Sequence, residues 1–324
     1  MPRVTSADVA SRAGVSRATV SYVLNNTPGQ SISAATRSRV LAAAALLGYA
    51  PSAAARTLRT GRSDVVLCLL PDWPIGNEVG NLLGNLSTEL ARAGLTFVVH
   101  PGSEADRPAA EIWKAITPAA VITFAGFSED ELGAMRAAGI AVVVALLGRP
   151  GADGCELQMP QQLIGKRQAH HLSGTGHSRL GYAAPDDDRL RIFAVPRLAG
   201  VRANTPAEPL VETVPLDPER AAEAVRRWYE AGVTGVCAYN DEVALAVLAG
   251  ARRLGLRVPG DLAVIGVDDL PAARLAVPSL TTVTTDQHAI AAHLAVGVLA
   301  AMSGSPEPVP PGGDLIRVIV RESA

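Results

Sequence analysis

The sequence predicts an all-α helix-turn-helix head followed by an α/β body of two Rossmann-like subdomains. The first 63 residues contain eight arginines and one acidic residue, a net charge of +7, although the whole chain of 324 residues has a net charge of −2. Within this basic segment, apolar residues recur at helical spacing between capping residues. Beyond it, short apolar runs alternate with amphipathic stretches, which is typical of parallel sheets covered by helices.

Composition limits the class of protein further. The chain is 48% hydrophobic and 19% charged, which is enough apolar material for a sizeable core. Cys68, Cys155 and Cys237 are far apart and odd in number, so we expect buried thiols and no disulfide framework. No apolar run reaches the length of a membrane span, and the N-terminus has no apolar signal-peptide region. We therefore expect a cytoplasmic protein with no membrane partner.

Two short helices are predicted at the start of the chain. Thr5 and Asp8 form a capping box, which predicts a helix that ends at Gly14, a residue type favoured after a helix C-terminus. Ser16 is a good N-cap for a second helix that ends near Leu24. The turn between the two helices is so short that they must meet at a sharp angle, as in a helix-turn-helix.

A third helix completes the predicted head. It begins near Ser33, buries Val40, Ala44 and Leu47, and stops at Gly48. Three helices in about 50 residues form one small domain.

The second helix presents a distinctive outer face. If Val20, Val23 and Leu24 face inward, the residues left outside are Arg17, Ala18, Ser21 and Tyr22. These are the positions that a recognition helix offers to base edges in the major groove. The alternative is an ordinary solvated surface, but the high positive charge of the head favours a polyanionic partner.

The segments "VTSADVASRAGVSRATVSYVLNN" and "ISAATRSRVLAAAALLGYAPSAAARTLRTGRS" resemble the head of the lactose/galactose repressor family of bacterial transcription regulators. The resemblance implies binding to a pseudo-palindromic double-stranded DNA operator as a homodimer. The implied DNA-contact residues are Thr5, Ser16, Arg17, Ala18, Thr19, Ser21, Tyr22, Asn25, Ala55, Leu58 and Arg59.

The resemblance also implies a hinge helix within residues 51–63, between the head at 1–50 and the body at 64–324. In the family, the residue matching Leu58 wedges into the minor groove, and Ala55 and Arg59 match its flanking contacts. The alternative for Leu58 is a linker leucine docked on its own domain. Tyr22 departs from the arginine usual in the family, so the operator sequence is expected to differ.

The body is predicted to contain eight strands with helices between them. The strands are expected in the apolar runs at 64–70, 95–100, 119–124, 140–147, 179–184, 210–216, 235–240 and 262–269. The helices are expected near 78–93, 107–116, 129–138, 161–173, 217–231 and 241–254. About 260 residues is large for one such unit, which favours two subdomains with a cleft between them.

The body, too, resembles the family, whose effector-binding core has a periplasmic-binding-protein-like fold. "HHLSGTGHSRLGYAA" and "YNDEVALAVLAGARRLGLRVPGDLAVIGVDDLP" carry this resemblance. It implies a small polar effector, sugar-like or nucleoside-like, in the cleft. Arg197, Asn240 and Asp268 match effector-contact positions. The alternatives are a surface salt bridge for Arg197, a helix N-cap for Asn240 and a strand-end turn for Asp268.

Two segments depart from the family pattern. "PDWPIGNEV" keeps the aspartate as Asp72 but lacks the usual asparagine and aromatic residue, and Trp73 could stack on a sugar ring or cover the core. The 197–210 segment is short, and Pro206 ends any helix there. An unusual effector or weak effector control would follow.

The sequence therefore predicts a DNA-binding transcriptional regulator, a repressor controlled by a small-molecule effector. The last residues, "LIRVIVRESA", contain no heptad run, so a dimer is expected. No nucleophile–base pair, dinucleotide fingerprint or metal-ligand spacing is evident, so we expect no enzyme activity, cofactor or metal. The alternatives are a soluble sugar-binding protein without a DNA role and, less favoured, a nicotinamide-dependent oxidoreductase.

Overall fold

The computed structural model describes residues 4–25, 27, 29–49, 63–101, 109–124, 127–144, 161–306, 308 and 315–324. The chain divides into a unit of Met1–Asp64 and a unit of Val65–Ala324. Among the described residues, no helix combines the length and the apolar composition needed to cross a bilayer.

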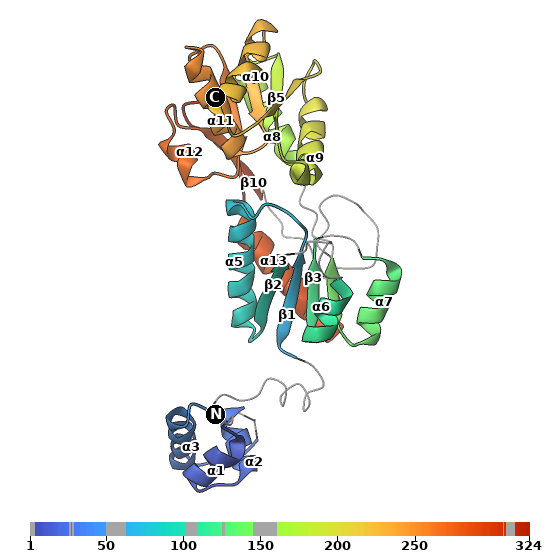
Figure 1. The fold of residues 1–324 in the computed structure, drawn as a ribbon, viewed down its shortest axis with the longest axis vertical. Coiled ribbons are helices and arrows are strands. Elements are labelled where there is room, and N and C mark those ends of the chain that lie inside the picture. The colour runs from blue at the N-terminus through green and yellow to red at the C-terminus, as the bar shows by residue number, and fades with distance from the viewer. Residues whose placement is uncertain are drawn as a thin grey trace. The chain divides into compact units, whose positions relative to one another are not determined.

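The first unit contains the three helices expected in the head (Figure 1): α1 Ser6–Ala13, α2 Arg17–Leu24 and α3 Ala34–Leu46. Their side chains pack around a common core that includes Val9, Val20, Val23 and Val40, each of which is at most 3% exposed.

The predicted caps of these helices are confirmed. The backbone N–H of Thr5 donates to Asp8 Oδ2 at 2.8 Å, which is half of the capping box. Ser16 Oγ accepts from the backbone N–H of Thr19 at 3.1 Å, so α2 begins where expected. Gly14 ends α1 with a φ of 65°, a left-handed conformation that favours glycine. The sharp α1–α2 turn therefore follows from local sequence.

The second unit contains two sheets (Figure 1). The first subdomain has a parallel sheet in the order β2-β1-β3-β4. Its strands are β1 Val65–Leu70, β2 Thr96–Pro101, β3 Ala120–Thr123 and β4 Ala141–Val144. Its helices are α5 Asn77–Arg92, α6 Ala109–Ile116, α7 Glu129–Ala137 and α13 Gln287–Ser303.

The second subdomain has a six-stranded sheet in the order β10-β9-β8-β7-β5-β6, in which only β9 and β10 pair antiparallel. Its strands are β5 Leu180–Pro185, β6 Leu210–Val214, β7 Gly235–Ala238, β8 Ala263–Val267, β9 Thr281–Thr285 and β10 Ile316–Ile319. Its helices are α8 Gln161–Gly174, α9 Arg191–Arg202, α10 Pro218–Glu230, α11 Asp241–Arg253 and α12 Pro271–Leu275, with a 3-10 turn at Asp188–Leu190.

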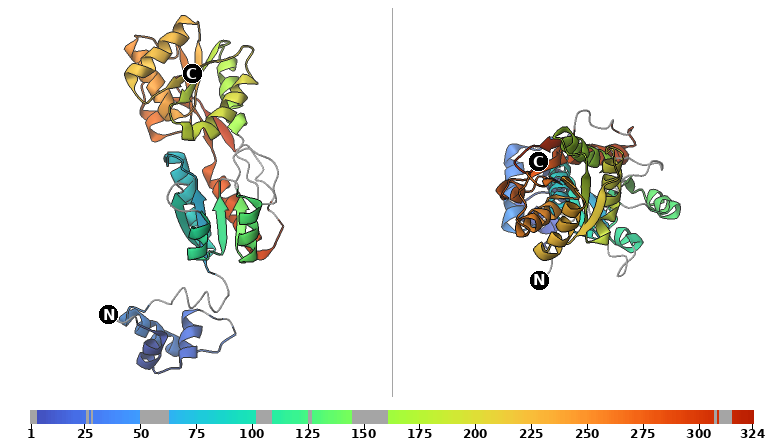
Figure 2. Two further views of the ribbon diagram at one scale, coloured as in Figure 1. Left: turned by 45° about the vertical axis from the view of Figure 1, so that its right-hand side comes forward. Right: turned by 90° about the horizontal axis from the view of Figure 1, so that it is seen from above.

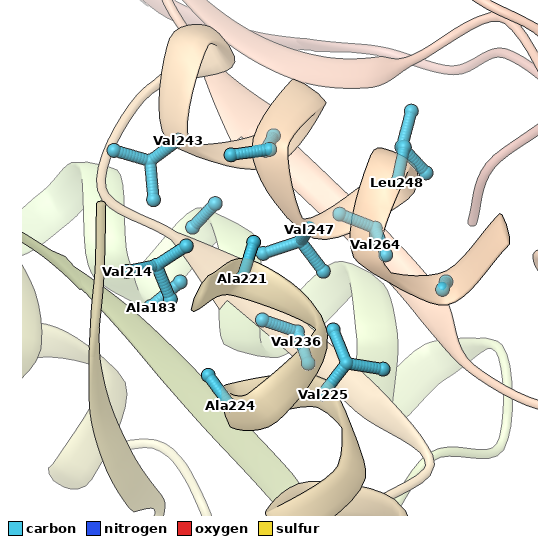
Figure 3. Packing of buried hydrophobic residues seen from close by; sticks show 14 of the residues in the cluster. Ala183, Val214, Ala221, Ala224, Val225, Val236, Val243, Val247, Leu248 and Val264 are labelled. Atoms are coloured by element: carbon cyan, nitrogen blue, oxygen red, sulfur yellow. The ribbon is translucent and has the colours of Figure 1, made fainter. Parts of the chain in front are cut away.

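Helices α10 and α11 cover one side of this sheet with small apolar residues. Ala221 and Val225 of α10 gather with Val247 of α11 over Val236 and Val264 of the strands (Figure 3). All five are completely buried. The small side chains let the helices pack close to the sheet, so the strand ends that carry the site are held rigidly.

The chain returns to the first subdomain after β9. Helix α13 packs Ile290, Leu294 and Val298 into the same core as β1, β3 and α5 (Figure 2). The chain then comes back as β10, which completes the second sheet. The strand β9 and helix α13 therefore join the two subdomains directly at residues 285–287.

All eight predicted strands and all six predicted helices of the body are present. Helices α9, α12 and α13 and strands β9 and β10 were not predicted. Helix α9 begins at Arg191, before the short segment singled out, and ends at Arg202, before Pro206.

Candidate functional site

The body contains a cavity that opens to solvent and is lined by side chains of both subdomains; with the solvent space at its mouth it measures about 540 Å³. An adjoining cavity, about 630 Å³ with its own open mouth, shares Glu78, Phe193, Arg197 and Asp268 with it. The cavity lies where β8 and β9 end and where α5, α8 and α9 begin or pass. Ligand sites in open α/β sheets lie at such carboxyl ends of strands.

Arg197 lies inside this pocket and is only 7% exposed. Its Nε donates to Gln161 Oε1 and its Nη1 donates to the carbonyl oxygen of Tyr239, both at 2.7 Å. The guanidinium also lies 4.8 Å from the centre of the Tyr239 ring. The alternative of a surface salt bridge is therefore wrong, because the group is buried and its hydrogen-bond partners are uncharged.

The position of Arg197 depends on an unusually close contact between α8 and α9. A Cβ atom on Gly165 would lie 1.9 Å from the carbonyl oxygen of Arg197, and one on Gly200 would lie 2.0 Å from the carbonyl oxygen of Gln162. Only glycine fits at both places. The two backbones consequently touch, and this contact brings Gln161 of α8 within reach of the guanidinium.

Asp268 directly follows β8 and also lines the pocket. Its φ is 107°, an unfavourable conformation for a residue other than glycine, and its backbone N–H donates to the carbonyl oxygen of Val283 at 2.8 Å. No described residue donates a hydrogen bond to its carboxylate. Burial raises the pKa of this carboxyl to about 6, and Arg197 opposes the shift while Glu242 adds to it.

Glu78, in the first turn of α5, is a pocket residue that the sequence analysis missed. It accepts hydrogen bonds at Oε2 from Gln287 Nε2 and, at 3.4 Å, from Thr285 Oγ1. Its pKa is raised from 4.5 to about 7, mainly by burial and also by the charge of Asp268, while Gln287, Arg197 and Thr285 act in the opposite direction. Its partners are over 200 residues away in sequence, so no local pattern indicated its role.

Three aromatic rings form one wall of the pocket. Trp73 packs against Phe124, with ring centres 5.6 Å apart, and edge-on against Phe193 at 4.9 Å. All three residues line the cavity. Trp73 therefore both covers the core and faces the cavity, so the two roles considered for it are compatible.

Asn240 also has two compatible roles. Its Oδ1 accepts from the backbone N–H of Val243 at 3.0 Å, so it is the N-cap of α11. It also lines the adjoining cavity.

Asp72 lies apart from the other predicted effector residues and lines neither cavity. Its side chain is 66% exposed, and its carboxylate lies 3.4 Å from Nη1 of Arg189. The structure therefore brings together four of the five predicted effector residues, with Asp72 outside.

In the head, α2 presents the expected outer face. Arg17, Ala18 and Tyr22 are exposed and Ser21 is partly exposed, while Val20 and Val23 are buried. The side chain of Asn25 donates to the carbonyl oxygen of Ser21 at 2.7 Å, which extends the end of the helix.

The other predicted DNA-contact residues of the head are at helix starts. Ser16 Oγ lies 2.9 Å from Thr19 Oγ1, and Thr5 Oγ1 donates to Asp8 at 2.7 Å. Both serve as caps and lie at the surface or close to it. Ala55, Leu58 and Arg59, like Cys155, lie outside the described residues.

A basic helix-turn-helix head attached to a two-sheet body, whose pocket combines an aromatic wall with a few charged and polar side chains, defines a class of protein, the ligand-responsive DNA-binding regulators. Comparison with known proteins supports the assignment to this class. Residues 5–52 match the model of bacterial regulatory proteins of the lacI family, and residues 169–324 match a periplasmic binding protein-like domain.

Individual relatives align over nearly the whole chain. The transcriptional regulator reg1 of Streptomyces lividans is 30% identical over 322 residues, which cover 93% of this chain and 91% of that protein. The solved complex of the transcriptional regulator CelR with cellobiose is 27% identical, with a TM-score of 0.64, and the match covers 99% of this chain and 100% of that one. The Lac repressor dimer bound to operator and an anti-inducer shares the fold, with a TM-score of 0.78, 23% identity and 99% of each chain covered.

The chain therefore belongs to the lacI family of bacterial regulatory proteins, and it is a DNA-binding transcriptional regulator. The predicted family and fold class are confirmed. The alternative of a sugar-binding protein without a DNA role is disfavoured, because residues 5–52 match the lacI family model in addition to the match of the body to a periplasmic binding protein-like domain.

Proposed function

We propose that this regulator represses transcription as a homodimer on a pseudo-palindromic operator, and that a small hydroxylated ligand in the pocket changes its affinity for DNA. The observation that carries the proposal is the convergence of Arg197, Asp268 and Gln161 on one cavity with an aromatic wall. The proposal involves no catalysis, and it places the protein in the cytoplasm, where its DNA is.

The pocket chemistry supports a polar ligand. The side chain of Gln161 is 4% exposed and uses its Oε1 for Arg197, and no described residue accepts a hydrogen bond from its Nε2. Unpaired polar atoms in a pocket are costly unless a ligand or water satisfies them. Trp73 offers a flat apolar surface for one face of a sugar ring. Sugars present both hydroxyls and apolar faces, and the similar regulator CelR was solved with cellobiose.

We assign the DNA contacts in two groups. Arg17, Ala18, Ser21 and Tyr22 are placed on the exposed face of α2 to meet base edges in the major groove. The second group is assigned to the DNA backbone and fixes the orientation of the head: Thr5, Ser16, Thr19 and Asn25. The family resemblance adds Leu58 as a minor-groove wedge, flanked by Ala55 and Arg59.

The test begins with selection of bound sequences from a random DNA pool by the full-length protein. The selected duplex is then used in a release titration with cellobiose, with single neutral sugars and with amino sugars. We expect an inverted-repeat motif, and a ligand that shifts DNA affinity in the wild type. No enriched sequence, or no sugar that alters binding, would contradict the proposal.

Two variants test the pocket in the same assay. Asp268→Asn and Arg197→Ala should weaken the ligand response by more than tenfold, since a hydrogen bond to a charged group contributes about 1.5–3 kcal/mol. Both variants should bind the operator normally without ligand, because the substitutions lie in the other structural unit. An unchanged dose response in both would place the ligand elsewhere.

A further inference from the structure

Among the residues that the structure describes, the charges lining the two adjoining cavities do not balance. The described charged side chains in their linings are the carboxylates Glu78, Asp268 and Glu242 and the guanidinium of Arg197. A neutral sugar would leave this excess of negative charge uncompensated in a partly desolvated space, which is unfavourable.

The guanidinium of Arg197 already has partners within the described part of the protein, none of which is a carboxylate. Two of its N–H groups bind Gln161 and the Tyr239 carbonyl, and its guanidinium lies over the Tyr239 ring. None of the described hydrogen bonds of Arg197 goes to a carboxylate. It lowers the pKa of Glu78 and of Asp268, yet burial holds both above their ordinary values.

The carboxylates keep free acceptor positions toward the cavity. Both hydrogen bonds to Glu78 arrive at Oε2, so within the described part of the chain Oε1 receives none. Asp268 receives no side-chain or backbone hydrogen bond at its carboxylate in the same region. The two residues come from different subdomains, so a donor placed between them would contact both sides of the pocket.

The aromatic wall suits a cation as well as a sugar ring. Trp73, Phe124 and Phe193 line the same cavity as Glu78 and Asp268, and ammonium groups are attracted to the faces of aromatic rings. A metal ion is the other candidate cation. However, no group of three or more metal-binding side chains occurs among the described residues, whereas an ammonium group needs only a few acceptors.

We propose that the ligand of this pocket carries a positive charge, and that it is an amino sugar or a hydroxylated amine of similar size whose ammonium group lies between Glu78 and Asp268. This inference rests on the proposed function and specifies its ligand class. The ammonium donates to Glu78 Oε1 and to the Asp268 carboxylate, the aromatic wall covers the ring, and Arg197 and Gln161 bind hydroxyls. Binding thereby joins the two subdomains through opposite charges.

The experiment compares three probes that share a ring and differ in charge. Calorimetric titration of the full-length protein near neutral pH uses glucosamine, glucose and glucuronate. We expect glucosamine to bind at least about tenfold more tightly than glucose, as a charge-assisted hydrogen bond allows, and glucuronate to bind weakest. Glu78→Gln should reduce the advantage of glucosamine over glucose about tenfold.

Glu230→Gln is the matched control, because this exposed glutamate on α10 lines neither cavity. It should bind all three probes like the wild type. If glucose or glucuronate binds as well as glucosamine does, the ligand is not cationic and the inference is overturned, while the proposed function stands. Binding of none of the three at millimolar concentration overturns the inference as well, while failure to select an operator would remove the proposed function itself.

Discussion

Glu78 connects the charge of the pocket with the stability of the whole body. Its pKa rises from 4.5 to about 7 in the folded protein, mainly through burial and then through Asp268. Between these pH values, the folded state therefore holds a proton that the unfolded state has lost. Since stability falls with pH wherever the folded state binds more protons, this carboxyl lowers stability as the pH rises from 4.5 to about 7.

Glu78→Gln removes this effect, because glutamine does not titrate. We expect the melting temperature of the variant, relative to the wild type, to increase as the pH rises from 4.5 to about 7 and to stay constant above that. Thermal unfolding followed by circular dichroism at a series of pH values measures it. Asp241, which also has a raised pKa and is not among the groups that shift Glu78, titrates in both proteins and cancels in the difference. A difference in melting temperature that stays constant with pH would show that folding does not raise the pKa of Glu78.

Tyr22 sets the base preference that we propose for α2. Its side chain is 36% exposed and its hydroxyl can make a single bond to a base edge, whereas arginine can bind guanine O6 and N7 together. Tyr22→Arg should therefore shift one half-site position toward guanine, with about 1–3 kcal/mol of discrimination. Selection from a random duplex pool with both proteins measures this. Identical motifs would mean that Tyr22 does not meet the bases.

At the scale of elements, the contact between α8 and α9 supports the pocket. Gly165 and Gly200 allow the two backbones to touch, and Arg197 and Gln161 lie on the helices that this contact joins. The geometry of the site therefore depends on two glycines, which lie within two helical turns of Gln161 and Arg197 and have no side chain to keep the helices apart.

Gly165→Ala should separate these helices. The added methyl group would meet a carbonyl oxygen at 1.9 Å, and neither backbone can move without disturbing its own helix. Such overpacking costs roughly 1–3 kcal/mol. We expect a lower free energy of unfolding in denaturant titration, together with weaker ligand binding, because the carbonyl that must move belongs to Arg197.

Gly174→Ala is the control on the same helix, since a Cβ there would have open space around it. Its effect should be neutral or slightly stabilising, within about 1 kcal/mol, because alanine favours helix more than glycine does. Equal stability of the two variants would mean that the helices separate at no cost.

The elements that sequence could predict are those with a local signal. Capping residues marked α1, α2 and α3, and apolar runs marked β1 to β8. Helix α13 had no such signal, because apolar residues surround it: Ile290 and Leu294 are buried while Val296 and Leu299 are exposed. The threonine-rich β9 and the terminal β10 become strands only by pairing with each other and with β8. The missed elements thus depend on tertiary contacts.

The same distinction applies to the pocket. Arg197, Asn240 and Asp268 were found because the family resemblance marks them, and Trp73 because it lies in the loop that the family pattern marks after the first strand. Glu78 was missed because its role comes from Gln287, Thr285 and Asp268, which only the folded chain brings near it. Asp72 was included because it matches the aspartate usual in that loop, although its side chain is in solvent.

At the scale of the whole molecule, charge is divided between the two units. Residues 1–63 carry a net charge of +7, and the rest of the chain, with 30 acidic and 21 basic residues, carries −9. An acidic body repels DNA and a basic head attracts it. Ligand chemistry and DNA chemistry are thereby kept apart, which is the arrangement that a ligand-controlled regulator needs.

This division predicts how salt affects operator binding. The logarithm of the binding constant should fall linearly with the logarithm of salt concentration, with a slope of about −0.9 for each phosphate contact. Arg12 is exposed in the last turn of α1, the helix that crosses the DNA backbone in helix-turn-helix complexes. In a homodimer, Arg12→Ala removes two contacts at once, so the slope should become shallower by about 1.8.

Fluorescence anisotropy with a labelled operator at several salt concentrations measures these slopes. Arg252→Ala is the matched control, because it removes the same charge from an exposed position on α11 of the body. Its slope should equal that of the wild type. A change of only about 0.9 for Arg12→Ala would indicate that one head binds at a time and would contradict the dimer. Equal slopes for all three proteins would mean that Arg12 meets no phosphate. The slope counts the phosphates that the protein neutralises by contact, so the loss of a charge that makes no contact leaves it unchanged.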